Sequence, residues 1–326
     1  MNMFEFLIKK LKAHPRKIVF TEGTDPRILE ASARLLSGTF LTPVLVGNED
    51  EIQKAAEEAG FNIRGAIIID PTNFADMDKM VDLMVELRKG KMTAEQCRAT
   101  LGQANYFGTM LVKMGYADAL LGGATYSTAD TVRPALQIIK TKPGSKIVSS
   151  CFILVRPSAT GEREVLAMGD CAINIRPDED ALVETALECA KTAATFGIDP
   201  KIAFLSYSTK GSGKGEAVDK VKNACDKAKA AAPELAIDGE MQFDAAVSPV
   251  VGQQKFPGSA VAGHANTFIF PEIQSGNIGY KIAQRLGGFA AYGPILQGLN
   301  APINDLSRGC DADEVYKMAI ITAALA

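Results

Sequence analysis

The sequence is poor in the residues that build metal centres and histidine-dependent active sites. Only two of its 326 residues are histidines, His14 and His264, and its six cysteines are scattered without a C-x-x-C pair. A structural zinc site takes four closely spaced cysteine or histidine ligands, so we expect no metal site. A serine or cysteine nucleophile activated by histidine is disfavoured for the same reason. The cysteines are interpreted as free thiols of a protein in the reducing cytosol.

Long apolar runs and an excess of positive charge are missing as well. Residues 1–11 place Glu5 and two lysines among apolar side chains, which predicts a short amphipathic helix rather than a signal peptide. No apolar run is long enough to cross a bilayer. With 35 basic and 38 acidic residues, the net charge of −3 offers no broad surface for nucleic acid. We therefore expect a soluble cytoplasmic protein with neither a membrane nor a nucleic acid as partner.

Two common nucleotide-binding patterns are also absent. Residues 21–25 after the first strand pattern are T-E-G-T-D instead of G-x-G-x-x-G, which argues against a dinucleotide fold. Residues 206–215, S-Y-S-T-K-G-S-G-K-G, lack the first glycine of a P-loop and the Ser or Thr after its lysine, so ATP hydrolysis is disfavoured. Ser206, Ser208 and Thr209 fit a mobile polar loop at the mouth of a cleft, and they equally fit a solvated linker.

The chain does contain a regular alternation of strand and helix patterns. Apolar strand patterns occur at residues 17–20, 42–47, 66–70 and 117–123. Helix patterns occur at residues 76–90 and 93–114, and another helix is expected to begin at Pro26 with Asp25 as its cap. This alternation predicts a parallel sheet that is covered by helices.

The pattern changes after Lys142-Pro143-Gly144, which is the best hinge candidate in the chain. Further patterns predict strands at residues 147–155, 164–170 and 201–206, helices at 178–196 and 214–231, and a last buried strand within 261–271. The chain is expected to cross back near residues 299–302. The sequence therefore predicts two α/β domains with a cleft between them: residues 1–143 with 299–326, and residues 144–298.

A polar turn follows the strand pattern that ends near residue 123. It contains Ser127, Thr128, Thr131 and Arg133 at a change from strand to helix. In open α/β sheets ligands bind at the carboxyl ends of strands, and helix N-termini attract anions. The segment fits a phosphate site, but it also fits an ordinary capped turn because Ser and Thr cap helices. Arg133 favours the phosphate site slightly.

The densest group of reactive side chains lies at residues 304–314, N-D-L-S-R-G-C-D-A-D-E. Ser307 and Arg308 come just before a predicted C-terminal helix, where an oxyanion would be stabilised. Asp311 and Glu314 have the spacing of a capping box, so Glu314 fits a helix cap as well as a proton acceptor. We interpret the segment as a site that holds an anion and moves a proton beside it.

These segments resemble those of the short bacterial phosphotransacetylases (phosphate acetyltransferases). Residues 123–134, 206–211, 268–277 and 304–310 carry the resemblance in family order, over essentially the full chain. It implies two domains of the isocitrate/isopropylmalate dehydrogenase type, a homodimer, and reversible acetyl transfer between coenzyme A and inorganic phosphate. The ligands would be coenzyme A or acetyl-CoA, acetyl phosphate and phosphate, with no tightly bound cofactor.

The resemblance also implies roles for single residues. Arg308 would bind the phosphate or the developing oxyanion, and Ser307 would form a hydrogen bond near the thiol or the carbonyl group. Arg88 and Arg133 would contact phosphate-bearing ligands. With the nucleophile supplied by coenzyme A, Cys310 becomes a structural thiol.

A carboxylate on the last helix would take the thiol proton. The family generally has an aspartate seven residues after the serine, whereas this chain has Glu314 there and Asp313 one residue earlier. A thiol with a pKa of about 8.5 facing a carboxyl group near 4 makes this transfer unfavourable by about 6 kcal/mol. Either burial raises the pKa of the carboxyl group, or Arg308 and the helix N-terminus stabilise the thiolate. The thiolate would then attack acetyl phosphate directly.

Three alternatives stand beside this interpretation. A phosphate butyryltransferase would differ only in the size of its acyl pocket. A metal- and NAD-dependent decarboxylating dehydrogenase shares the fold, but it needs clustered acidic ligands and a nicotinamide site that the sequence does not show. A non-catalytic CoA-binding protein would bind the ligand without turnover.

Overall fold

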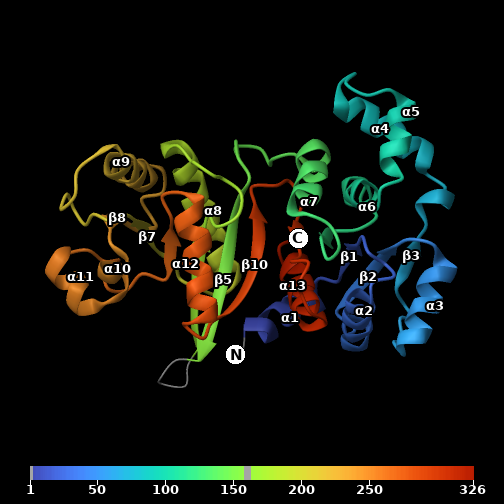
Figure 1. Ribbon diagram of the computed structural model, residues 1–326, viewed down its shortest axis with the longest axis horizontal. Coiled ribbons are helices and arrows are strands. Elements are labelled where there is room, and N and C mark those ends of the chain that lie inside the picture. Colours follow the sequence, from blue (N-terminus) through green and yellow to red (C-terminus); the bar gives the residue numbers. More distant parts are fainter. Residues whose placement is uncertain (1–2, 158–162) are drawn as a thin grey trace. The chain divides into compact units, whose positions relative to one another are not determined.

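The computed structural model describes residues 3–157 and 163–326, and the chain forms two compact α/β units (Figure 1). The first unit comprises Met1–Pro143 and Leu299–Ala326, and the second comprises Gly144–Gly298. Each unit is built on its own sheet. The predicted α/β class is confirmed.

The first unit contains a five-stranded sheet in the order β11-β4-β1-β2-β3, and all its neighbouring strands are parallel. Its strands are β1 (Arg16–Phe20), β2 (Leu41–Val46), β3 (Ile67–Ile69), β4 (Ala119–Gly122) and β11 (Ile303–Asp305). The chain adds β2 and β3 on one side of β1, and β4 and β11 on the other. The strand order therefore reverses between β1 and β4, and the carboxyl ends of these two strands flank the switch point where such sheets bind ligands.

Helices cover both faces of this sheet. Figure 1 shows α2 and α13 on one side of β1 and α6 on the other. The helices are α1 (Met3–Ala13), α2 (Pro26–Gly38), α3 (Glu49–Ala59), α4 (Met77–Arg88), α5 (Ala94–Leu101), α6 (Ala104–Lys113), α7 (Thr128–Pro134) and α13 (Ala312–Ala324), with short turns at Pro71–Asn73 and Ala135–Ile139. As predicted, α2 begins at Pro26, and the side chain of its cap Asp25 accepts a hydrogen bond from the Arg27 N–H group.

The prediction of one helix over residues 93–114 is wrong, because the chain forms α5 and α6 there. A capping box of Thr93 and Gln96 starts α5, and Gly102 ends it. Gln103 then has extended backbone angles and precedes the first residue of α6. Glycine is a poor helix former, so the break falls at the weakest position of the pattern.

The second unit contains a six-stranded sheet in the order β10-β5-β6-β9-β7-β8. Its strands are β5 (Ser149–Pro157), β6 (Arg163–Gly169), β7 (Lys201–Leu205), β8 (Ala236–Met241), β9 (Thr267–Ile269) and β10 (Ala290–Gln297). Strands β10, β5 and β6 pair antiparallel, and β6, β9, β7 and β8 pair parallel. Its helices are α8 (Glu179–Thr195), α9 (Glu216–Ala231), α10 (Phe243–Val247), α11 (Pro249–Lys255) and α12 (Ile273–Arg285).

The expectation that the last strand lies within residues 261–271 is wrong, because β10 and β11 follow it. Gly293-Pro294 interrupts the apolar pattern of β10. The strand forms nevertheless, because it lies at the edge of its sheet and its register shifts between Tyr292 and Ile295, where a proline is tolerated. Across residues 3–157 and 163–326, no helix has the length and the apolar character needed to span a membrane.

Candidate active site

The carboxyl edge of the first sheet gathers most of the predicted site residues. Strands β4 and β11 are parallel neighbours in which Gly122 is paired with Asp305. The Leu306 N–H group donates a hydrogen bond of 2.7 Å to the Gly122 carbonyl oxygen. The connection from β4 to α7 and the loop from β11 to α13 therefore start side by side. They carry Ser127, Thr128, Thr131, Arg133, Ser307 and Arg308.

Asp305 joins the two segments, although no separate role was predicted for it from the sequence. Its carboxylate accepts hydrogen bonds from the hydroxyl groups of Thr128 and Thr131, each at 2.6 Å, and only 2% of the residue is exposed. Burial raises the pKa of Asp305, and the two hydroxyl groups oppose that shift. Both threonine protons are thus directed at a buried carboxylate. Binding of phosphate by these threonines stays a prediction.

Ser127 and Arg133 share a second carboxylate. The Ser127 hydroxyl donates to Asp130 Oδ2 at 2.7 Å, and Arg133 Nη1 donates to Asp130 Oδ1 at 3.0 Å. The Arg133 side chain is 53% exposed, and a surface ion pair of this kind contributes at most about 1 kcal/mol. Arg133 can therefore exchange its bond with Asp130 for a ligand phosphate at little cost.

Arg308 carries an exposed cation in the loop between β11 and α13. Its guanidinium forms no hydrogen bond or ion pair with residues 3–157 or 163–326. The neighbouring Ser307 is also exposed, and its hydroxyl oxygen accepts a long bond of 3.3 Å from the Gly309 N–H group. The loop thus presents a free guanidinium and a hydroxyl proton, which together suit an oxyanion.

Arg27, which the sequence analysis missed, fixes this loop. Its Nη1 donates to the main-chain oxygens of Arg308 at 2.9 Å and Cys310 at 3.2 Å, and its Nη2 donates to the Ala124 oxygen at 3.0 Å. The carboxylate of Asp25 holds the same guanidinium at 2.7 Å. The planar guanidinium presents several N–H groups in a fixed geometry, so it sets the two loops relative to each other.

The two candidate proton acceptors on α13 differ in their surroundings. Burial alone would raise the pKa of Asp313, but hydrogen bonds and charges from Lys317 and Arg34 bring it below its usual value. The two cations lie 2.6 and 2.8 Å from its oxygens. Glu314 is exposed, and it forms the predicted capping box with Asp311 at 2.8 and 3.2 Å. The two ion pairs therefore weaken Asp313 as a proton acceptor.

Glu22 is a further carboxylate that the sequence analysis missed. It follows β1, and its Oε1 accepts N–H bonds from Gly123 at 2.9 Å and Thr125 at 3.3 Å. Its Oε2 accepts the Thr21 hydroxyl at 2.7 Å, and that hydroxyl lies 2.8 Å from the Tyr126 hydroxyl. Burial raises the pKa of Glu22, and these hydrogen bonds oppose the shift. Glu22 and Tyr126 line a cavity of about 300 Å³ at the switch point.

Arg88 lies apart from these contacts, at the end of α4. Its Nε is buried without a hydrogen-bond partner in the part of the chain that the structure describes. It lies close to Cys97 on α5, whose pKa is raised by burial while the Arg88 charge opposes the shift. No hydrogen bond or ion pair between described residues links Arg88 to the other predicted site residues. Its role stays a prediction.

Ser206, Ser208 and Thr209 lie in the second unit, between β7 and α9. Ser208 and Thr209 are buried, so the solvated-linker interpretation is wrong for them. The Ser208 hydroxyl donates to Glu240 Oε1 at 2.9 Å, and Thr209 Oγ1 accepts the Gln242 N–H group at 2.9 Å. These bonds fold the loop onto β8 and the residue after it. Contact of the three residues with a substrate stays a prediction.

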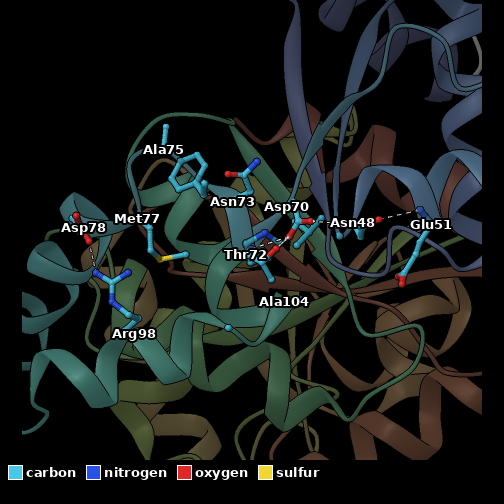
Figure 2. A pocket seen from close by; sticks show the side chains of 15 residues that line it. Asn48, Glu51, Asp70, Thr72, Asn73, Ala75, Met77, Asp78, Arg98 and Ala104 are labelled. Carbon is cyan, nitrogen blue, oxygen red and sulfur yellow. Dashed lines mark hydrogen bonds and ion pairs between the residues drawn. The ribbon is translucent and has the colours of Figure 1, made fainter.

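A larger cavity of about 850 Å³ lies at the carboxyl ends of β2 and β3. Figure 2 shows Asn48 and Asp70 on one side, joined at 3.0 Å, and Arg98 paired with Asp78 on the other. None of the predicted site residues lines it. Glu51 adds a third carboxylate against the single arginine, so this cavity is unfavourable for a phosphate-bearing ligand.

Two further features are the state of the cysteines and the grouping of possible metal ligands. All six cysteines are free and buried. Burial raises the pKa of Cys310 to about 11, which keeps it protonated and a poor nucleophile at neutral pH. Within residues 3–157 and 163–326, no three His, Cys, Asp or Glu side chains are grouped to hold a metal ion.

The chain belongs to the family described as phosphate acetyl/butaryl transferase, whose model matches residues 2–323. The chain is similar to a phosphate acetyltransferase of Bacillus subtilis (strain 168), with 54% identity over 100% of this chain and 99% of the relative. It is also similar in structure to a phosphotransacetylase from Streptococcus pyogenes, with a TM-score of 0.94, 55% identity and coverage of 99% and 97% of the two chains.

A more distant structural likeness bears on the fold alone. A putative 4-hydroxythreonine-4-phosphate dehydrogenase from Salmonella typhimurium is 12% identical, with a TM-score of 0.54 and coverage of 95% and 99%. The predicted relation to a dehydrogenase-type fold agrees with this likeness.

Proposed function

We propose that this chain is a phosphate acetyltransferase, which moves an acetyl group reversibly between coenzyme A and inorganic phosphate. Membership of the family makes it an acyltransferase, and the relatives of 48–54% identity favour phosphate over any other acetyl acceptor. The observation that carries the proposal is the exposed Arg308 guanidinium, which has no partner among the described residues and lies beside Ser307 at the carboxyl edge of the first sheet.

The proposed step is a direct displacement. Arg308 binds the phosphate group of acetyl phosphate, and Arg133 leaves Asp130 to share that charge. The thiolate of coenzyme A attacks the carbonyl carbon, so a C–S bond forms while the C–O bond to phosphate breaks. The Ser307 hydroxyl group donates a hydrogen bond to the carbonyl oxygen, on which negative charge develops. Binding both substrates at one place supplies the proximity that a reaction in solution lacks.

Several finer features belong to the same proposal. Arg88, Ser206, Ser208 and Thr209 contact the substrates, and Thr128 and Thr131 support the anion site. The two compact units act as two domains, with residues 1–143 and 299–326 in one and residues 144–298 in the other. The enzyme works as a cytoplasmic homodimer. Coenzyme A is a substrate, and no cofactor is held between turnovers.

We expect acetyl-CoA and phosphate together to release free coenzyme A without ATP or NAD. A thiol-specific reagent would follow the release, and omission of phosphate is the control. Butyryl-CoA should react more slowly, because the alternative of a butyryltransferase is not favoured by the named relatives. Thiol release that is independent of phosphate would contradict the proposal, and NAD reduction with hydroxy acids would instead support the dehydrogenase alternative.

Asp313→Asn is expected to lower stability without lowering turnover. Its ion pairs with Arg34 and Lys317 are partly exposed, so their loss should cost about 0.5–1 kcal/mol. The lowered pKa means that this contribution is present above the usual carboxyl pKa of about 4 and is lost as pH falls below it. Urea unfolding of both proteins from pH 7 downward should show the largest difference at pH 7 and a shrinking one as pH falls through the lowered pKa of Asp313. A large fall in kcat would instead indicate that Asp313 takes part in catalysis.

A further inference from the structure

Strand β11 ends in a buried carboxylate, two residues before Ser307. Only 2% of Asp305 is exposed, and its two oxygens accept the hydroxyl groups of Thr128 and Thr131, each at 2.6 Å. Neither donor is charged, and no cation within residues 3–157 and 163–326 forms an ion pair with this carboxylate. Burial of a carboxylate without a counter-ion is unfavourable for folding. Another requirement therefore keeps Asp305 in this place.

Both donors belong to α7, the helix that also carries Arg133. Thr128 is the first residue of α7 and Thr131 follows three positions later, so their side chains are neighbours on one face of the helix. The carboxylate thus bonds the helix at two points, which fixes the orientation of the helix as well as its distance from β11. One further bond reaches α7 from α6, where Asn105 Nδ2 donates to the Asp130 main-chain oxygen at 2.8 Å. These bonds set the direction in which Arg133 leaves the helix.

The carboxylate of Asp305 has little room to move. A Cβ atom at Gly123 would lie 2.3 Å from Asp305 Oδ1, and 3.0 and 3.1 Å from the main-chain O and N of Leu306. Gly123 has a φ of +102°, so a side chain at this position would also be strained. The connection from β4 to α7 therefore packs directly against Asp305 and the residue that precedes Ser307.

Strand β11 is also bonded to the last helix. The side chain of Asn304 is buried, and its Nδ2 donates to Thr322 Oγ1 of α13 at 2.9 Å. Successive side chains of a strand point to opposite faces of the sheet, so Asn304 and Asp305 hold β11 from its two faces. The end of β11 is therefore a fixed point from which both α7 and the loop of Ser307 and Arg308 are placed.

We propose that Asp305 is a positioning residue, which holds α7 so that Arg133 reaches the same anion as Ser307 and Arg308. This assignment rests on the proposed acetyl transfer. Asp305 itself does not bind the substrate, because both of its oxygens are occupied by the threonines. Two arginines from separate elements share one phosphate group only while the spacing between those elements is kept. The length of the side chain at position 305 is therefore decisive, and its charge is not.

Two substitutions separate the length of this side chain from its charge. Asp305→Asn keeps the shape, and its amide accepts one threonine hydroxyl and donates to the other, so kcat/KM for acetyl phosphate should stay within about threefold of the wild type. Asp305→Glu keeps the charge but lengthens the side chain by one C–C bond of about 1.5 Å. It should lower this kcat/KM about 10–100-fold, since misplacement by about 1 Å is costly. The KM for coenzyme A should stay near the wild-type value in both variants.

Stability should follow a different order from activity. Burial raises the pKa of Asp305, and a carboxyl group whose pKa rises on folding favours the folded chain only in its protonated form. That contribution is lost as pH rises through the raised pKa, so it is absent at pH 7. The amide of Asp305→Asn resembles the protonated form. This variant should therefore unfold at the same urea concentration as the wild type at pH 7, or at a higher one.

Arg133 provides the measurement that a purely structural role would not change. Because Asp305 acts through Arg133, Asp305→Glu should cause little further loss in a chain that already carries Arg133→Ala, so the two losses are not additive. Asp70→Glu is the matched control. Asp70 follows β3 and also accepts bonds from neutral donors, Thr72 and Asn48, but it lines the larger cavity. Asp70→Glu should act like the wild type.

A third variant keeps the test decisive if Asp305→Glu does not fold. Thr131→Val removes one of the two bonds to Asp305 without added volume, and it should raise the KM for acetyl phosphate about tenfold, the effect of losing one hydrogen bond to a charged group. Wild-type kinetics in the folded length variant, or in Thr131→Val if that variant alone folds, would overturn the assignment.

Two other results would also count against the positioning role. A loss of about 10²-fold in Asp305→Asn with an unchanged unfolding midpoint would give the charge itself a direct part in the reaction. Fully additive losses with Arg133→Ala would show that Asp305 does not act through Arg133. A wild-type chain that transfers no acetyl group between coenzyme A and phosphate would refute the acetyl transfer itself, so the two failures are distinguishable.

Discussion

Arg308→Ala is expected to reduce kcat/KM for acetyl phosphate by a factor of about 10²–10³, as removal of a preorganised charge-stabilising donor does in other enzymes. The guanidinium has no partner within the described residues, so its loss leaves no buried group unpaired. The free energy of unfolding should therefore change by less than about 0.5 kcal/mol, as for other surface substitutions. Steady-state kinetics with varied acetyl phosphate and urea unfolding measure the two effects.

Two variants sharpen that test. Arg308→Lys keeps the charge but loses the two-point geometry of the guanidinium, so it should recover only part of the activity. Arg98→Ala removes an arginine whose charge is paired with Asp78 in the larger cavity, and it should act like the wild type. If Arg308→Ala retained most of its turnover, the anion site would have to be placed elsewhere.

Arg27→Met is expected to damage both stability and turnover. The oxygens of Ala124, Arg308 and Cys310 lose their donor, and the mostly buried Asp25 loses its counter-ion. We expect the free energy of unfolding to fall by about 2–3 kcal/mol, because a charge is left unpaired. The loosened Arg308 loop should lower kcat by about 10–100-fold, since small misplacements of positioning groups are costly. Urea unfolding and initial rates give the two values.

Arg34→Ala is the matched control, because this arginine lies on the same helix but binds Asp313 near the surface. Its loss should cost less than about 1 kcal/mol and leave kcat unchanged. Equal kinetic defects in Arg27→Met and Arg34→Ala would show that any destabilisation of α2 slows the enzyme. That result would refute the positioning role of Arg27.

The elements that the sequence predicts well are those with strong local signals. Pro26 after Asp25 marks the start of α2, and Asp311 with Glu314 marks the start of α13. Strands of the first sheet are short, mostly apolar runs between turns. Two strands that were missed lack such signals: Gly293-Pro294 divides β10, and β8 carries Asp238 and Glu240 within its six residues. Their pairing with neighbouring strands decides their structure, and a single sequence does not contain that information.

The residues of the candidate site also differ in whether the local sequence marks them. Ser307 and Arg308 were found because nucleophilic and charged groups crowd one short segment. Glu22, Arg27 and Asp305 were missed as site residues because their partners are distant in sequence: Arg27 bonds to residues 281 and 283 positions away, and Asp305 to residues 174 and 177 away. Only the parallel pairing of β1, β4 and β11 brings these groups to one edge.

Arg27 holds the two loops through main-chain oxygens, which every amino acid possesses. The path of the backbone therefore supplies most of the support of the site, and the Cys310 thiol adds one side-chain contact at 3.7 Å from Arg27 Nη1. Side chains in these loops are free to change with the ligand while the scaffold beneath them stays the same. A change of acyl or anion preference can thus be engineered at the loop surface without redesign of the sheet.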